Sequence, residues 1–128
     1  MVTQRGQALV ESALAFPLLV VLMLALVQFA LYAHAVDVAQ GACQDGARVA
    51  AQADRTVGDG VATAQSLLLA GLGPSARAIT VRGQTDGQVV ALEAQGTTRL
   101  LLPWFGDASL PVQATAEAAK ETFRASGG

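Results

Sequence analysis

The sequence predicts a mixed α+β fold in which a long N-terminal helix carries a second short helix and a small three-stranded antiparallel sheet. Two observations support this prediction. A strongly apolar, uncharged stretch near the N-terminus is followed by small side chains at helical spacing. Nearer the C-terminus the pattern changes to two-residue alternation, which is typical of strands. We therefore expect one small domain in the 128 residues, with the sheet packed on the distal half of the long helix.

Composition excludes several classes of protein. Hydrophobic residues make up 52% of the chain and charged residues only 14%, which is too apolar for a disordered chain and too poor in charge for an ordinary soluble domain. The eight Lys and Arg residues are scattered singly and the net charge is −2. A nucleic-acid partner, which requires a basic stripe, is therefore not expected.

The apolar stretch predicts a transmembrane helix. No charged side chain lies between Glu11 and Asp37, and residues 13–35 would reach about 34 Å as a helix, enough for a hydrocarbon core of roughly 30 Å. Arg5 precedes the stretch and acidic residues follow it. By the positive-inside rule, the N-terminus lies in the cytoplasm and the rest of the chain lies across the membrane.

A cleavable secretory signal is an alternative, because Ala33-His34-Ala35 has the small-x-small form that signal peptidase recognises. The apolar stretch is longer than the 7 to 15 residues that are typical of such signals, and only one basic residue precedes it. We therefore favour a membrane anchor.

Beyond the membrane the helix is expected to continue, so that one helix covers residues 7–54. Small side chains recur along one face at Val36, Ala39, Cys43, Ala47 and Ala50, with Asp54 at the end of the same face. Such a face lets a sheet or a second helix approach closely. A break is predicted at residues 56–60 and a second helix at residues 61–70, ended by the Gly-Leu-Gly-Pro sequence of residues 71–74.

Three segments predict the sheet. Residues 79–82 and 90–95 alternate between apolar and polar, and Asp86-Gly87 between them is a strong hairpin signal. A third strand at residues 110–118 is expected to bury Val112, Ala114 and Ala116. Three strands packed on a helix are enough for a small stable module.

The loop of residues 100–106 is the most apolar segment outside the predicted span, and it holds the only Trp. Leu101, Leu102, Trp104 and Phe105 form a candidate partner surface, which would dock on another protein or rest on the membrane. The alternative, which we favour, is that they cap the sheet edge and fill a core that is poor in large side chains.

Motifs for catalysis or cofactor binding are not apparent. His34 and Asp37 are spaced to touch on one helix face, but no third ligand is placed to join them, so a polar collar at the membrane exit is favoured over a metal site. Cys43, the only cysteine, is interpreted as a small apolar side chain. We expect no enzyme activity, no cofactor, no metal and no small-molecule substrate.

Glu11 stands alone at the start of the apolar helix. A carboxylate there is costly if it faces lipid, so it has a partner or a function. The alternative is that it lies among the lipid headgroups and complements the positive end of the helix dipole.

The start of the chain resembles the TadE-like family, the minor pseudopilins of tight-adherence (type IVc) pilus systems. The similarity lies in residues 5–19 (RGQALVESALAFPLL), where a glycine, four mostly apolar residues and a glutamate also resemble a prepilin signal. Residues 46–50 (GARVA) and the alternating alanines of residues 112–118 (VQATAEA) are similar to later parts of the family pattern.

The resemblance implies a pilin-like chain with a leader at residues 1–6, a transmembrane helix at residues 7–36 and an exported head at residues 37–128. A prepilin peptidase would cut after Gly6 and make Gln7 the mature N-terminus. The Glu11 carboxylate would then pair with the free amine of a neighbouring subunit. The implied partners are that peptidase, other pilin or pseudopilin subunits and membrane lipid, in a bacterial inner membrane with the head on the periplasmic side or in a pilus.

Two functions of different classes follow. The first is a minor pseudopilin that helps to build a pilus. The second is an uncleaved single-pass anchor whose exported head binds envelope components. Their mature N-termini differ, since the first begins at Gln7 and the second at Met1, whereas a secreted protein would begin after Ala35.

Overall fold

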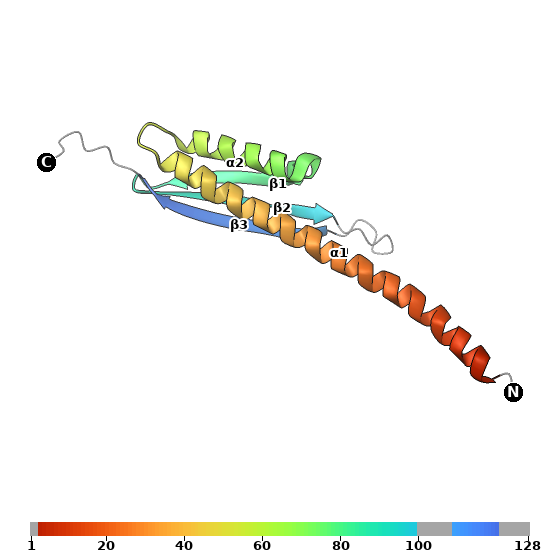
Figure 1. The fold of residues 1–128 in the computed structure, drawn as a ribbon. Coiled ribbons are helices and arrows are strands. Elements are labelled where there is room, and N and C mark those ends of the chain that lie inside the picture. Colours follow the sequence, from red (N-terminus) through yellow and green to blue (C-terminus); the bar gives the residue numbers. More distant parts are fainter. Residues whose placement is uncertain (1–2, 100–108, 121–128) are drawn as a thin grey trace.

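The computed structural model describes residues 3–99 and 109–120, and these form an α+β fold (Figure 1). The elements in chain order are α1 (Thr3–Ala51), α2 (Val57–Leu72), the 3₁₀ helix η1 (Gly73–Ala78), β1 (Ile79–Thr85), β2 (Val89–Arg99) and β3 (Ser109–Ala119). The predicted fold class, with its long helix, second helix and antiparallel sheet, is confirmed.

The three strands form an antiparallel meander in the order β1-β2-β3. Both helices pack on one face of this sheet: α1 runs along β2 and β3, whereas α2 lies against β1 (Figure 1). The inward side chains alternate along the strands as the sequence predicted, and they include Val81, Leu92, Val112 and Ala114. Ala116 is half-buried instead of fully buried. Among the elements of residues 3–99 and 109–120, no helix covers the opposite face of the sheet.

Small side chains on α1 allow the helix to lie close to its neighbours. Ala39, Cys43 and Ala47 are buried, as the spacing predicted, and Ala50 is buried beside them. Gly46 faces α2, and a Cβ added to it would lie 2.6 Å from the carbonyl oxygen of Gly60. The two helices therefore touch backbone to backbone, which only glycine permits at this distance.

The predicted break at residues 56–60 and the predicted start of α2 at residue 61 were wrong, because α2 begins at Val57. Thr56 and Asp59 form a capping box: the Asp59 amide donates to Thr56 Oγ1 (3.2 Å), and the Thr56 amide donates to Asp59 Oδ2 (3.0 Å). Gly60 does not break the helix, because its missing side chain is what lets α2 approach α1.

The ends of the other elements have local causes. α1 begins at Thr3 and ends at Ala51, four residues earlier and three residues earlier than predicted. Lys120 Nζ donates to the carbonyl oxygens of Ala50 (3.1 Å) and Arg55 (2.8 Å), which holds the end of β3 against the end of α1. α2 ends within the predicted Gly-Leu-Gly-Pro sequence, and η1, which the sequence did not predict, follows it.

The hairpin between β1 and β2 forms at the predicted Asp86-Gly87 turn. Asp86 Oδ1 accepts hydrogen bonds from the amides of Gln88 and Val89, both at 2.8 Å. Gly87 has a φ of 95°, which a residue with a side chain rarely adopts. This turn fixes the register in which Thr85 pairs with Val90.

Candidate membrane and assembly surface

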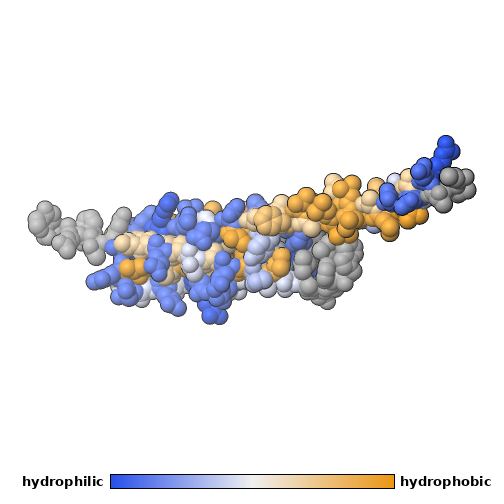
Figure 2. Space-filling view, turned by 90° about the horizontal axis from the view of Figure 1, so that it is seen from below, coloured by the Kyte–Doolittle hydropathy of each residue, from blue (hydrophilic) through white to orange (hydrophobic). Residues whose placement is uncertain are grey.

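The N-terminal half of α1 extends away from the head (Figure 1). Nearly all of its residues from 4 to 27 are exposed, and its large side chains Leu9, Leu14, Phe16 and Leu18 expose 68% to 71% of their surface. Figure 2 shows this segment as a hydrophobic rod with hydrophilic side chains near its tip. An apolar surface of this extent requires a membrane or other apolar helices around it.

Among the described residues, α1 is the helix that is long and apolar enough to cross a membrane. This is consistent with a single-pass membrane anchor. The 21 residues that separate Gln7 from Gln28 correspond to about 32 Å of helix, which matches the thickness of a hydrocarbon core.

Within the described residues, Gln28 makes the first hydrogen bond between α1 and the sheet. This side chain is 5% exposed, and its Nε2 donates to the carbonyl oxygen of Arg99 at the end of β2 (3.4 Å). Tyr32 donates its hydroxyl hydrogen to the Pro111 carbonyl (2.9 Å). The helical turn from Gln28 to Tyr32 therefore connects the protruding rod to the end of β2 and the start of β3.

A third hydrogen bond joins α1 to the sheet, since Gln40 Nε2 donates to the Thr115 carbonyl (2.8 Å). Sequence analysis missed the role of Tyr32 and Gln40. For Tyr32 the available signal was its position four residues after Gln28, because residues at this spacing share one face of a helix. The acceptors, however, lie 71 to 79 residues away in the chain.

Gly6 and Gln7 lie inside α1, close to its tip. A Cβ added to Gly6 would meet no atom within 4 Å. Glycine in a helix costs about 1 kcal/mol relative to alanine, so packing within this chain gives no reason for a glycine here. Gly46, by contrast, is required by the contact with α2.

Glu11 is exposed on the same rod. It makes no hydrogen bond or ion pair with any residue in the described ranges. The helix begins at Thr3 and has no acidic residue in its first turn, so Glu11 sits in the third turn of the full chain. The dipole interpretation is weakened by this position, because the effect of the dipole falls off within the first turn.

The structure does not bring all of the predicted site residues together. Gly6, Gln7 and Glu11 share the protruding part of α1, far from the sheet (Figure 1). Leu101, Leu102, Trp104 and Phe105 fall outside the described residues. The residues that flank their loop, Arg99 and Ser109, pair with each other where β2 ends and β3 begins.

His34 and Cys43 both make contacts within the head. His34 Nε2 donates to the Gly71 carbonyl (3.2 Å) and so links α1 to the last turn of α2. Cys43 is buried, and its Sγ lies 3.8 Å from the Ala114 carbonyl. Burial raises the pKa of the Cys43 thiol, which makes a reactive thiolate scarce at neutral pH. Within residues 3–99 and 109–120, no group of three His, Cys, Asp or Glu side chains could hold a metal ion.

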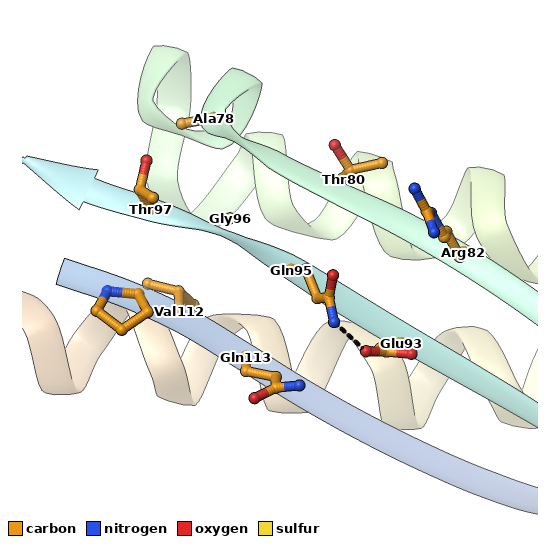
Figure 3. A pocket seen from close by; sticks show the side chains of 10 residues that line it. Ala78, Thr80, Arg82, Glu93, Gln95, Gly96, Thr97, Val112 and Gln113 are labelled. Carbon is orange, nitrogen blue, oxygen red and sulfur yellow. Dashed lines mark hydrogen bonds between the residues drawn. The ribbon is translucent and has the colours of Figure 1, made fainter. Parts of the chain in front are cut away.

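The uncovered face of the sheet has a hollow of about 460 Å³ (Figure 3). Polar side chains from all three strands line it, among them Thr80, Arg82, Gln95 and Gln113. Glu93 accepts a hydrogen bond from the Gln95 amide. The hollow therefore offers hydrogen-bonding groups to a partner.

Comparison with protein families confirms the resemblance at the start of the chain. Residues 6–48 match the family described as "TadE-like protein". The match covers about a third of the chain, from the exposed apolar part of α1 to the part that packs on the head. No curated protein and no solved structure matches the chain.

Proposed function

We propose that this chain is a minor pseudopilin, a structural component of a tight-adherence pilus that is inserted in the bacterial inner membrane and processed after Gly6. One observation carries the proposal: the family match begins at Gly6 and runs through the protruding rod to Arg48, where α1 is packed on the head. The matched segment thus coincides with the part of the chain that would enter a membrane and then a pilus.

The proposed segments are the leader at residues 1–6, the transmembrane helix at residues 7–36 and the exported head at residues 37–128. The contacts of Gln28 and Tyr32 with the sheet support placing residues 28–36 at the level of the lipid headgroups. The N-terminus would then lie in the cytoplasm and the head in the periplasm, as the position of Arg5 before the span favours.

Two features of the rod support processing and assembly. The fold has no steric need for a glycine at position 6, so the requirement would come from the peptidase that binds there. Glu11 has no partner among the described residues, and a carboxylate near the membrane edge is strongly stabilised by a cation. After cleavage, the Gln7 amine of a neighbouring subunit would supply that cation.

The second candidate is an uncleaved anchor whose head binds envelope components. The polar hollow on the uncovered face of the sheet favours it, because this face can accept a partner without disturbing the core (Figure 3). The state of the N-terminus separates the two candidates.

The decisive experiment is to measure the mass of the full chain, extracted from membranes of cells with and without the prepilin peptidase. The proposed function requires loss of residues 1–6 only when the peptidase is present. We predict that Gly6→Val blocks this loss, because a branched side chain would obstruct a site that accepts glycine.

Gly41→Val is the matched control, because Gly41 lies in the same helix and a Cβ there also meets no atom within 4 Å. This variant should be processed like the wild type. An uncut wild-type chain in the presence of an active peptidase would contradict the pseudopilin proposal and favour the anchor.

A further inference from the structure

The two outer edges of the sheet differ in what their backbone groups bind. The edge formed by β3 is covered by α1, since Tyr32 and Gln40 donate to the carbonyl oxygens of Pro111 and Thr115. Pro111 also has no N–H to donate, and a proline on an edge strand discourages pairing with another strand. The β3 edge is therefore closed to a further strand.

β1 forms the other edge, and its register shows which backbone groups face outward. The Asp86 amide donates to the Val89 carbonyl (3.3 Å), and hydrogen-bonded pairs recur at every second residue from there along the antiparallel ladder. The N–H and C=O groups of Val81 and Gly83 consequently point away from β2. In the described part of the chain, nothing forms a hydrogen bond with these four groups.

The chain around β1 is described without a gap from residue 3 to residue 99. Residues 100–108 join β2 to β3, and residues 121–128 follow β3. Every neighbour of β1 along the chain is therefore among the described residues, and the unpaired groups of β1 are a template for another strand.

On the side of the helices, apolar side chains border this edge. α2 lies against β1, and a Cβ added to Gly83 would collide with Val57 and lie 3.0 Å from Val61 Cγ2. Val57 and Val61 are only half-buried. The glycine thus lets two valines lie over the edge, where they would cover apolar side chains of an added strand.

On the opposite side of the sheet, the same edge carries an exposed cation. Arg82 lies between Thr80 and Gln84 on β1, and all three are exposed; Figure 3 shows Thr80 and Arg82 beside the polar hollow. Arg82 makes no ion pair with any residue that the structure describes. Glu93, which is opposite Arg82 on β2, accepts a hydrogen bond from Gln95. An acidic residue on an added strand would therefore find a free cation here.

We propose that the outer edge of β1 binds an extended segment of another envelope protein, which adds a fourth strand to the sheet. Hydrogen bonds to the backbone of Val81 and Gly83 supply the affinity, and the alternating side chains supply the specificity. The apolar side chains of the segment lie against Val57 and Val61. Its polar side chains lie on the other side, with an acidic one opposite Arg82.

A second copy of this chain is the other occupant to consider. Its β3 edge is already covered by α1. Antiparallel pairing of two β1 strands would point the two rods in opposite directions, because the strands run along the axis of α1 (Figure 1), and two chains anchored in one membrane do not permit this. The choice of a different protein rests on the membrane placement given under the proposed function.

The test uses the purified full chain in detergent and a seven-residue peptide, VTVEVTV, in which the central glutamate replaces a threonine. Amide hydrogen exchange followed by NMR is the readout. In the free protein, the amides of Val81 and Gly83 should exchange faster than those of Thr80 and Arg82, which pair with β2. The peptide should slow exchange at Val81 and Gly83. Unchanged exchange at both residues in excess peptide would overturn the proposal.

The charge opposite Arg82 distinguishes strand addition from unspecific adsorption. A peptide with lysine in place of the glutamate should bind about two- to thirtyfold more weakly, because a like-charge pair replaces an opposite-charge pair. Arg82→Glu should reverse this preference. Arg48→Glu is the matched control, since Arg48 is an exposed cation on α1, and it should leave the preference as in the wild type. Equal affinity of the wild type for both peptides, or the same change in both variants, would overturn the proposal.

Light scattering in detergent tests the second copy as the occupant. The chain should show no dimer that the glutamate peptide dissociates, and such a dimer would assign the β1 edge to a second copy and overturn the choice of partner. Circular dichroism establishes that each variant is folded before affinities are compared. Peptide binding does not require processing after Gly6, which is measured separately in cells, so that failure of this proposal and failure of the pseudopilin proposal remain distinguishable.

Discussion

At the scale of single residues, the informative side chains are those that the fold does not explain. Gly6 has open space around it and Glu11 has no described partner, although glycine weakens a helix and a carboxylate is costly near lipid. Gly46 and His34, in contrast, are accounted for by contacts within the chain. We therefore expect Gly6 and Glu11 to act in contacts with other molecules.

Replacing Glu11 by glutamine separates assembly from insertion. Glu11→Gln removes the charge and keeps the size, so insertion and cleavage should remain as in the wild type. The ammonium of a neighbouring Gln7 would lose its counter-ion, at a cost of about 1 to 3 kcal/mol. We expect pilus-dependent adhesion to fail while the protein stays abundant in the membrane, as measured by an adhesion assay and immunoblotting.

Glu117→Gln provides the matched control, because Glu117 is an exposed carboxylate on β3, away from the membrane segment. Its adhesion should equal that of the wild type. Normal adhesion of the Glu11 variant would show that the carboxylate has no pairing role, and the dipole interpretation would then be preferred.

At the scale of elements, α2 shows how a local signal and a distant contact together determine where a helix starts. The capping box of Thr56 and Asp59 defines its first turn. Gly60, three residues after the start, is a residue type that weakens helices, but here it is buried against α1. The close contact between α1 and α2 therefore depends on Gly46 and Gly60, which lie 14 positions apart in the chain.

Alanine substitutions in α2 test this account. Gly60→Ala would place a Cβ against the Gly46 carbonyl and Ala50, and overpacking of this kind costs about 1 to 3 kcal/mol. Gly58→Ala, in the same helix, meets nothing closer than Thr56 Oγ1 at 3.5 Å, and the better helix propensity of alanine should stabilise by up to about 1 kcal/mol. Thermal unfolding in detergent measures both changes. Equal stability of the two variants would contradict the close packing.

Asp59 gives α2 a dependence on pH. The backbone amide of Thr56 donates to the carboxylate and lowers the pKa of Asp59 below its ordinary value. A lowered pKa in the folded state means that the unfolded chain binds more protons, so the stability contributed by Asp59 is present above a pH of about 4 and is lost as the pH falls further.

The variant Asp59→Asn should therefore lose less stability than the wild type between pH 6 and pH 3, as followed by the unfolding temperature. Asp45→Asn is a suitable control, because Asp45 lies on α1 and is not part of the capping box. Identical pH profiles of the wild type and Asp59→Asn would show that the capping box contributes nothing at this end of α2.

At the scale of the whole molecule, the chain consists of an apolar rod and a packed head that share one helix (Figures 1 and 2). The buried apolar residues of the described head begin at Ala35, whereas the rod up to residue 27 contributes almost nothing to that core. The head should therefore not need the rod in order to fold.

Deletion of residues 1–27 tests this division. The shortened chain begins at Gln28, which keeps its hydrogen bond to Arg99, and it should be soluble and folded without detergent because the exposed apolar surface of the rod has been removed. Size-exclusion chromatography and circular dichroism in plain buffer measure this. An aggregated or unfolded product would mean that the rod stabilises the head, and the full chain, which should require detergent, is the reference.

The sequence by itself determined the elements with strong local signals. The charge-free stretch, the small-residue face of α1, the two-residue alternation of the strands and the Asp86-Gly87 turn each depend on residues close together in the chain. The opening motif with Gly6 and Glu11 was likewise visible in the sequence, and the family match over residues 6–48 bears out that resemblance.

Only the tertiary structure decided where the rod meets the head and what forms there. Gln28 and Tyr32 are joined to the sheet by hydrogen bonds that span 71 and 79 residues. Residues of α1, α2, η1 and β2 together line a crevice near the point where the rod meets the head. The start of α2 likewise depended on the burial of Gly60 against Gly46. Periodicity and turn signals describe the chain over a few residues, whereas these features result from close packing between distant segments, which local patterns do not encode.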